Sequence, residues 1–161
     1  LASSSLPFTV NFIFSLILIS TFLGSKFSTS SRKLPINEVI GDTADGPSGQ
    51  IVVILGGHAE ITKCKDELSD AVFGVISESP AFLMNAQAGN NDSHPMVALK
   101  GRVMVKLQGK GQAGDRVVSA GNGEARVAAM DECTAFNTLG RLIKHKYNVE
   151  TALTECVIGV K

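Results

Sequence analysis

The feature that most constrains the fold is a pattern of short apolar runs separated by turn residues, which extends from residue 41 to residue 161. Glycine, aspartate and asparagine interrupt these runs repeatedly, and 16 of the 161 residues are glycine. Turns this frequent leave little room for long amphipathic helices, whereas strands of about four to eight residues fit between them. The pattern therefore predicts an all-β domain, a small barrel or sandwich of about eight to ten short antiparallel strands.

The clearest predicted strand covers residues 96–107, with the sequence MVALKGRVMVKL. Apolar side chains occupy its odd positions and charged side chains its even positions, with Gly101 interrupting the apolar row. Because successive side chains of a strand point to opposite faces, the odd positions are expected to face the core. The apolar residues are Val97, Leu99, Val103, Val105 and Leu107, and the charged ones are Lys100, Arg102 and Lys106.

The remaining strands are predicted between clusters of turn residues, at 50–55, 59–63, 71–77, 116–120, 124–130, 138–143 and 154–160. Gly56-Gly57 predicts a hairpin turn, and Gly74 inside a strand indicates a bulge or a close backbone approach. The glycine-rich segment 109–115 is interpreted as a hairpin turn, because neither a Lys-Ser/Thr pair nor a helix follows it, as a phosphate-binding loop requires. A single helical turn is expected at 64–71.

A different segment precedes this domain. Residues 1–25 carry no charge, and residues 8–23 include eleven large apolar side chains. Exposing each of them to water would cost about 1.5–3 kcal/mol. A signal peptide, a transmembrane helix and a segment buried on assembly all meet this requirement. Residues 26–40 are expected to be a linker. The side chains predicted to drive assembly are Phe8, Phe12, Phe14, Leu16, Leu18 and Phe22.

Charge and chemistry-bearing residues argue against several functions. The 15 basic and 15 acidic residues cancel, which is not the balance of a nucleic-acid-binding protein. The basic cluster Arg141, Lys144, His145 and Lys146 is interpreted as a solvated loop or strand edge. His58, His94 and His145 form no catalytic or metal-binding motif. Cys64, Cys133 and Cys156 are expected to be reduced thiols. The sequence therefore predicts no enzyme, no cofactor and no metal.

Several motifs occur in a defined order. They are VFGVISESPAFLMN at 72–85, HPMVALKGRVMVK at 94–106, AGDRVV at 113–118, AGNG at 120–123 and ECVIGVK at 155–161. This series resembles a β-domain of tail fibres, appendages and other virion structural proteins of tailed bacteriophages. The resemblance covers about residues 48–161. Some proteins with this domain include autoproteolytic chaperone domains, but no cleavage site is assignable in this chain.

The resemblance implies a non-enzymatic structural module that assembles as a homotrimer with other virion proteins, with a receptor-facing role as an extension. A host-surface glycan or protein is then the expected outside partner, and the expected location is the virion. The apolar segment is not part of the family pattern. It keeps open a second interpretation, a secreted or membrane-tethered bacterial surface or filament protein with the same β-domain, in which residues 8–23 contact the membrane.

Overall fold

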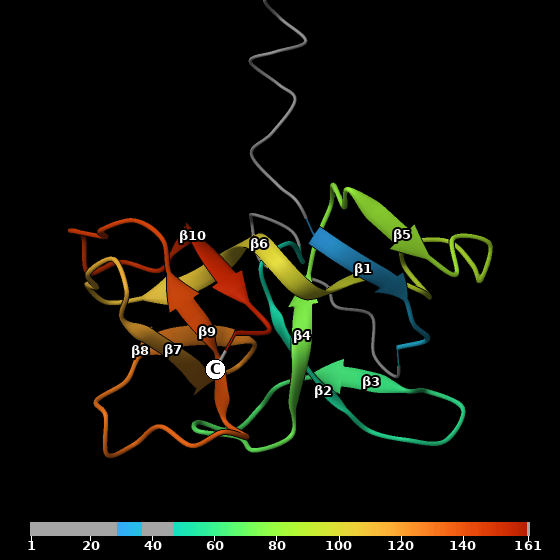
Figure 1. Cartoon of the computed structure of the whole chain (residues 1–161). Coiled ribbons are helices and arrows are strands. Elements are labelled where there is room, and N and C mark those ends of the chain that lie inside the picture. The colour runs from blue at the N-terminus through green and yellow to red at the C-terminus, as the bar shows by residue number, and fades with distance from the viewer. Residues whose placement is uncertain (1–28, 37–46, 161) are drawn as a thin grey trace, which may run out of the picture.

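The computed structural model describes residues 29–36 and 47–160, and these residues form an all-β structure without a helix (Figure 1). No helix long and apolar enough to cross a membrane occurs in these two ranges. The ten strands are β1 (Thr29–Lys33), β2 (Ile51–Ile54), β3 (Ile61–Lys63), β4 (Val72–Ile76), β5 (Phe82–Met84), β6 (Met96–Gln108), β7 (Arg116–Gly121), β8 (Glu124–Val127), β9 (Thr138–Leu142) and β10 (Ala152–Ile158).

Five of the strands close into a barrel. They are hydrogen-bonded in the order β10-β9-β7-β8-β6, and β6 pairs in turn with β10 to complete the ring. The β6–β10 ladder is the longest, from Gly101 paired with Ile158 to Leu107 paired with Ala152. Within this barrel, all pairs are antiparallel except β6 with β8. The predicted all-β barrel is confirmed.

Strand β6 belongs to two parts of the structure. Its second half closes the barrel, while its first half pairs with β4 and with β1. From β4 the sheet continues to β2 and β3, and from β1 it continues to β5 (Figure 1). The 13 residues of β6 therefore connect the barrel to a smaller sheet that extends beside it.

The face that β6 presents to the core changes along the strand. Ala98 packs in the same core as Val103, Val105 and Leu107, whereas Val97 lies in a second cluster against which Leu99 packs. A bulge opposite β1 leaves one extra residue on β6, and Gly101 has a φ of +113°. An extra residue moves the following side chains to the other face. The predicted single row of odd positions is therefore wrong: those residues are divided between two cores.

Other local predictions had mixed outcomes. Gly56-Gly57 forms the β2–β3 hairpin turn, with both residues at positive φ. Gly74 lies in close approach, since a Cβ there would be 2.5 Å from the carbonyl oxygen of Ala98. The segment 109–115 is a turn but not a hairpin, because it connects β6 to β7 and these strands do not pair. Residues 64–71 form turns and not a helix.

Two strands, β1 and β5, were not predicted. Strand β1 lies inside the segment expected to be a linker, and it pairs with both β5 and β6. Its sequence TSSRK has no apolar side chain, and β5 has only the three residues FLM, so neither shows the alternation by which a strand is recognised.

Candidate assembly surface

The six side chains predicted to drive assembly, from Phe8 to Phe22, lie outside the described residues, as does the predicted membrane contact at residues 8–23. The structure instead places an exposed strand edge next to β1, the strand at residues 29–33. This edge is β5, which pairs in parallel with β1 through Ser30 with Phe82 and Arg32 with Met84.

Strand β5 is an open end of the sheet. Within residues 29–36 and 47–160 it pairs with β1 alone, so one side of its backbone faces no other strand. Figure 1 shows β5 at the rim of the smaller sheet, on the far side of β1 from the barrel. An unpaired edge presents backbone N–H and C=O groups that another strand can bind.

The side chains of this edge are apolar. Phe82 is 62% exposed and Met84 is 37% exposed, and both point to the same face of the strand because they are two residues apart. Proteins usually protect an open edge with charged side chains or proline. Here Pro80 lies two residues before the strand, and no charged residue lies within it. The β5 edge therefore has the composition of a surface that pairs with another strand.

The other end of the sheet is partly covered. Strand β3 pairs with β2, and Ile36 bridges to Ile61 on the opposite side of β3. The amide of Ile61 also donates a hydrogen bond to the carbonyl oxygen of Pro35. Of the two sheet ends in the described part of the chain, β5 is thus the more accessible to a partner.

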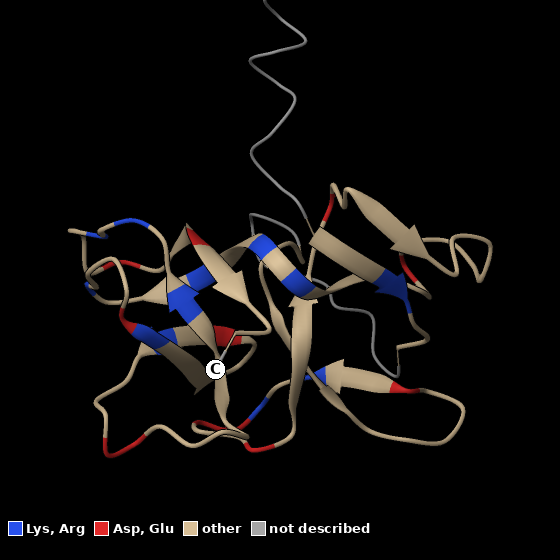
Figure 2. Ribbon diagram, viewed as in Figure 1, with Lys and Arg blue, Asp and Glu red and all other residues tan. Residues whose placement is uncertain are grey.

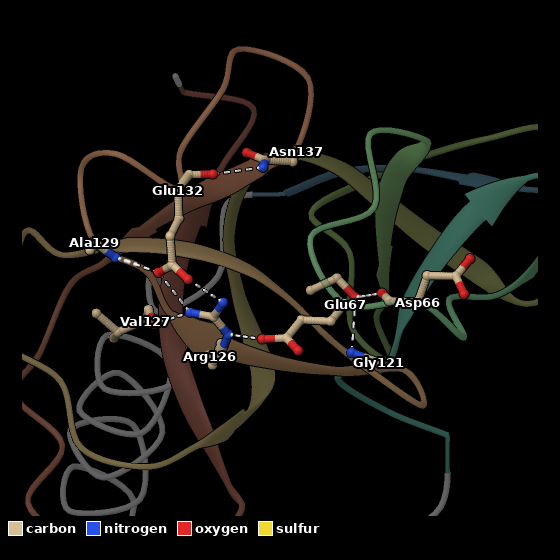
Figure 3. Close-up of polar contacts among 9 residues, drawn as sticks. Asp66, Glu67, Gly121, Arg126, Val127, Ala129, Glu132 and Asn137 are labelled. Atoms are coloured by element: carbon tan, nitrogen blue, oxygen red, sulfur yellow. Dashed lines mark hydrogen bonds and ion pairs between the residues drawn. The ribbon is translucent and has the colours of Figure 1, made fainter.

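A polar network holds the loops around the barrel in place (Figure 3). The Arg126 guanidinium on β8 contacts Glu132 at 2.8 Å, in the loop between β8 and β9, and Glu67 at 2.6 Å, between β3 and β4. The amide of Ala129 donates a further hydrogen bond to Glu132. The bond from Arg126, followed by that from Ala129, lowers the pKa of Glu132 to about 2. These acidic groups therefore serve the architecture of the barrel.

The predicted basic cluster lies on β9 and the loop after it. Lys144 and His145 are exposed there, as expected for a solvated loop. Lys144 pairs with Glu155 at 2.9 Å, so its charge is compensated locally. Figure 2 shows Lys and Arg mainly on the strands and Asp and Glu mainly in the loops.

Two lysines expected in solvent are buried instead. Lys106, assigned to the charged face of β6, is 4% exposed, and Lys146 is 6% exposed. The Lys146 ammonium donates hydrogen bonds to three backbone carbonyl oxygens, and desolvation lowers its pKa. The sequence does not predict the burial of Lys146, because its hydrogen-bond partners are main-chain carbonyl groups. Every residue has such a group, so the amino-acid types do not identify the partners.

The remaining candidate residues do not come together. No group of three His, Cys, Asp or Glu side chains in the described ranges is placed to hold a metal ion. His58 lies in the β2–β3 turn, and His94 contacts the hydroxyl of its neighbour Ser93 at 3.0 Å. The three cysteines are free thiols in the structure, and Cys64 and Cys156 are buried whereas Cys133 is partly exposed. Burial, with a smaller effect of Glu155, raises the pKa of Cys156 to about 12.

Comparison with known proteins finds likeness in structure and not in sequence. No protein-family model and no curated protein matches the chain. Pre-mature gene product 12 of bacteriophage phi29 matches with a TM-score of 0.56 and 14% identity, over 85% of this chain and 22% of that one. The chain thus spans about a fifth of that protein.

The C-terminal fragment of the same phi29 gene product matches over 81% of this chain and 99% of the fragment, with a TM-score of 0.53 and 13% identity. The N base of the phi29 head fiber gp8.5 has a TM-score of only 0.42 at 12% identity, over 83% and 92% of the two chains, and it carries no argument here. The resemblance to a β-domain of phage virion proteins is therefore confirmed at the level of the fold.

Proposed function

We propose that this chain is a non-enzymatic structural module of a virion fibre or appendage, and that it assembles into a homotrimer in which the β5 edge of each copy contacts a different surface of the next copy. The observation that carries the proposal is the open, apolar β5 edge beside β1. Main-chain pairing across such an edge supplies affinity, and the alternate side chains Phe82 and Met84 supply specificity.

The likeness in fold supports the setting. The domain corresponds to nearly the whole C-terminal fragment of phi29 gene product 12, a protein of a bacteriophage. Neither sequence motifs nor clustered titratable groups in the described residues suggest catalysis, and the most perturbed carboxylate, Glu132, is held in ion pairs. A location in the virion and a receptor-facing role are parts of the same proposal.

The apolar N-terminal segment fits this role. It precedes β1 in the chain, with residues 26–28 between them, and β1 pairs with β5. In the proposed assembly, the N-terminal segments of neighbouring copies bury their apolar side chains against one another. Burial of these side chains in the assembly, and not in lipid, then avoids the cost of about 1.5–3 kcal/mol for each large apolar side chain exposed to water.

Sedimentation equilibrium of the 161-residue chain tests the proposal. We expect the mass of three chains at micromolar concentration, and dissociation when Phe82 is replaced by Asp. Phe136→Asp is the matched control, because Phe136 is 70% exposed but lies in the loop between β8 and β9. A monomeric wild-type chain, or a Phe82→Asp chain that keeps the mass of the wild type, would overturn the proposal.

A further inference from the structure

The loop between β9 and β10 is anchored from within by Lys146. Its Nζ atom donates to the carbonyl oxygens of Gly109 at 2.6 Å, Asn148 at 2.9 Å and Glu150 at 2.6 Å. Lys146 and Gly111 also exchange two backbone hydrogen bonds, of 2.8 and 3.0 Å. The loop is therefore tied both to itself and to the neighbouring loop between β6 and β7.

The residues on either side of Lys146 are exposed. Because the chain is extended at this bridge, His145 and Tyr147 point outward where Lys146 points inward. The two rings stack with centroids 5.9 Å apart and planes inclined by 27°. His145 Nδ1 also accepts a hydrogen bond from the amide of Ala113 at 3.3 Å. Tyr147 is 79% exposed, so its ring lies open to solvent on a fixed support.

A hollow lies on each side of this aromatic pair. One, of about 870 Å³, is bordered by polar side chains of the β6–β7 loop, namely Lys110, Gln112 and Asp115. The other, of about 600 Å³, is bordered by Met104, Asn148 and Leu153, among others. His145, Lys146 and Tyr147 border both hollows. The aromatic pair therefore borders both hollows.

The Lys146 ammonium group is buried, and its hydrogen-bond partners are all main-chain carbonyl groups. Burying an ammonium group is unfavourable unless hydrogen bonds compensate it, and here three carbonyl groups are arranged to do so. These hydrogen bonds restrain the backbone that carries the exposed aromatic residues. Fixing the groups of a binding site before the ligand arrives lowers the entropy lost on binding.

We propose that this loop is a saccharide-binding site, with Tyr147 as the platform for a pyranose ring. The face of an aromatic ring is the negative side of its quadrupole, and it attracts the C–H bonds on the flat face of a sugar. The carboxylate of Asp115 and the amides of Gln112 and Asn148 accept and donate hydrogen bonds, which neighbouring sugar hydroxyls require.

The local charges favour this ligand over nucleic acid. Of the three lysines that border the two hollows, Lys144 is paired with Glu155 at 2.9 Å and Lys146 points into the protein, which leaves Lys110; a single cation is fewer than the phosphates of a nucleic acid require. The inference gives a site to the receptor-facing part of the proposed function. The saccharide site can prove wrong while the proposed assembly at β5 remains correct, because Tyr147 lies in the loop between β9 and β10 and not on β5.

NMR titration of the full chain with methyl glycosides of glucose, galactose, mannose, N-acetylglucosamine and N-acetylgalactosamine tests the site. At least one should shift the amide resonances of residues 110–115 and 145–148. Tyr147→Ala should weaken that binding by about tenfold or more, which corresponds to about 1.4 kcal/mol. Tyr147→Phe should retain it, and Phe136→Ala, a change at another exposed aromatic residue, should leave it unchanged.

Three results would overturn the inference. They are the absence of shifts with all five glycosides, binding that persists in Tyr147→Ala, and shifts of these residues by a proline-rich peptide but by no glycoside. Sedimentation of Tyr147→Ala separates this test from that of the proposed function. A Tyr147→Ala chain with the wild-type mass and lost glycoside binding supports the site, whereas one with an altered mass contradicts its independence from assembly.

Discussion

Gly140 on β9 lies directly against Ile158 on β10, so that a Cβ atom at residue 140 would be 2.8 Å from the Cα atom of Ile158. The same atom would come closer still to the carbonyl oxygen of Val157. The two residues are partners in the β9–β10 ladder. Two backbones this close leave no space for any side chain, so the closure of the barrel at this point depends on glycine.

Replacing Gly140 by Ala should therefore destabilise the domain by about 3 kcal/mol, because backbone atoms cannot yield as the end of a flexible side chain can. Urea unfolding measures the loss. Gly57→Ala is the control: its φ is also unfavourable for Ala, at +79°, but nothing lies within 4 Å of the added atom. The control should cost about 1 kcal/mol. Equal losses in the two variants would contradict the close approach of β9 and β10.

Val103→Asp should unfold the domain. Val103 is 3% exposed and belongs to the barrel core, so an aspartate there would bury an unpaired carboxylate. Circular dichroism during heating measures the effect. Lys100→Asp on the same strand is the control, since Lys100 is exposed and a surface substitution should change stability by only about 0.5 kcal/mol. A cooperative transition near the wild-type temperature in Val103→Asp would show that β6 faces the core differently.

Glu132→Gln should remove part of the acid sensitivity of folding. The pKa of Glu132 is lowered from 4.5 to about 2, mainly by the Arg126 hydrogen bond. A carboxylate whose pKa is lower in the folded than in the unfolded state stabilises the fold at pH values above its unfolded pKa. That stabilisation is lost as the pH falls from about 4.5 toward 2. Urea unfolding between pH 2 and 7 should thus show a shallower decline for Glu132→Gln. Parallel pH profiles for the variant and the wild type would contradict the assigned cause.

Thiol titration of the native protein should detect one reactive cysteine. Cys133 is partly exposed, whereas Cys64 and Cys156 are buried, with no exposed surface. The Cys156 pKa of about 12 also keeps its thiolate, the reactive form, scarce at pH 8. With a thiol-specific chromogenic reagent, we expect one fast equivalent in buffer and three in denaturant. Cys133→Ser should eliminate the fast equivalent, and a fast reaction that remains in it would show that a buried thiol is accessible.

The sequence predicts the fold better than it predicts which residues are exposed. Turn clusters such as Gly56-Gly57 separate the strands, and the alternation at 96–107 identifies β6, because both patterns arise from local geometry. The bulge in β6 depends on pairing with β1, a polar strand that no local pattern predicts. The burial of Lys146 depends on carbonyl oxygens up to 37 residues away, at Gly109. Non-local main-chain contacts of this kind cannot be inferred from side-chain periodicity.

The candidate assembly surface was not predicted for a similar reason. The sequence points to apolar residues 8–23, whose length and composition are conspicuous, whereas β5 has three residues and becomes a surface only because β1 pairs with it on one side. Phe82 is exposed because β5 lies at the end of the sheet, and the order of strands determines that position. A phenylalanine in a short apolar run is usually a core residue. The sequence alone therefore favours a buried Phe82 and not an exposed one.

Amide hydrogen exchange of Phe82, Leu83 and Met84 tests the central claim, assembly through the β5 edge, most directly. The measurement compares the full chain at a concentration where it assembles with the Phe82→Asp chain under the same conditions. Exchange at β5 should be slow in the assembly and fast in the variant, while β7 in the barrel should be equally protected in both. Fast exchange at β5 in a chain that has assembled would contradict it, because the interface would then lie elsewhere.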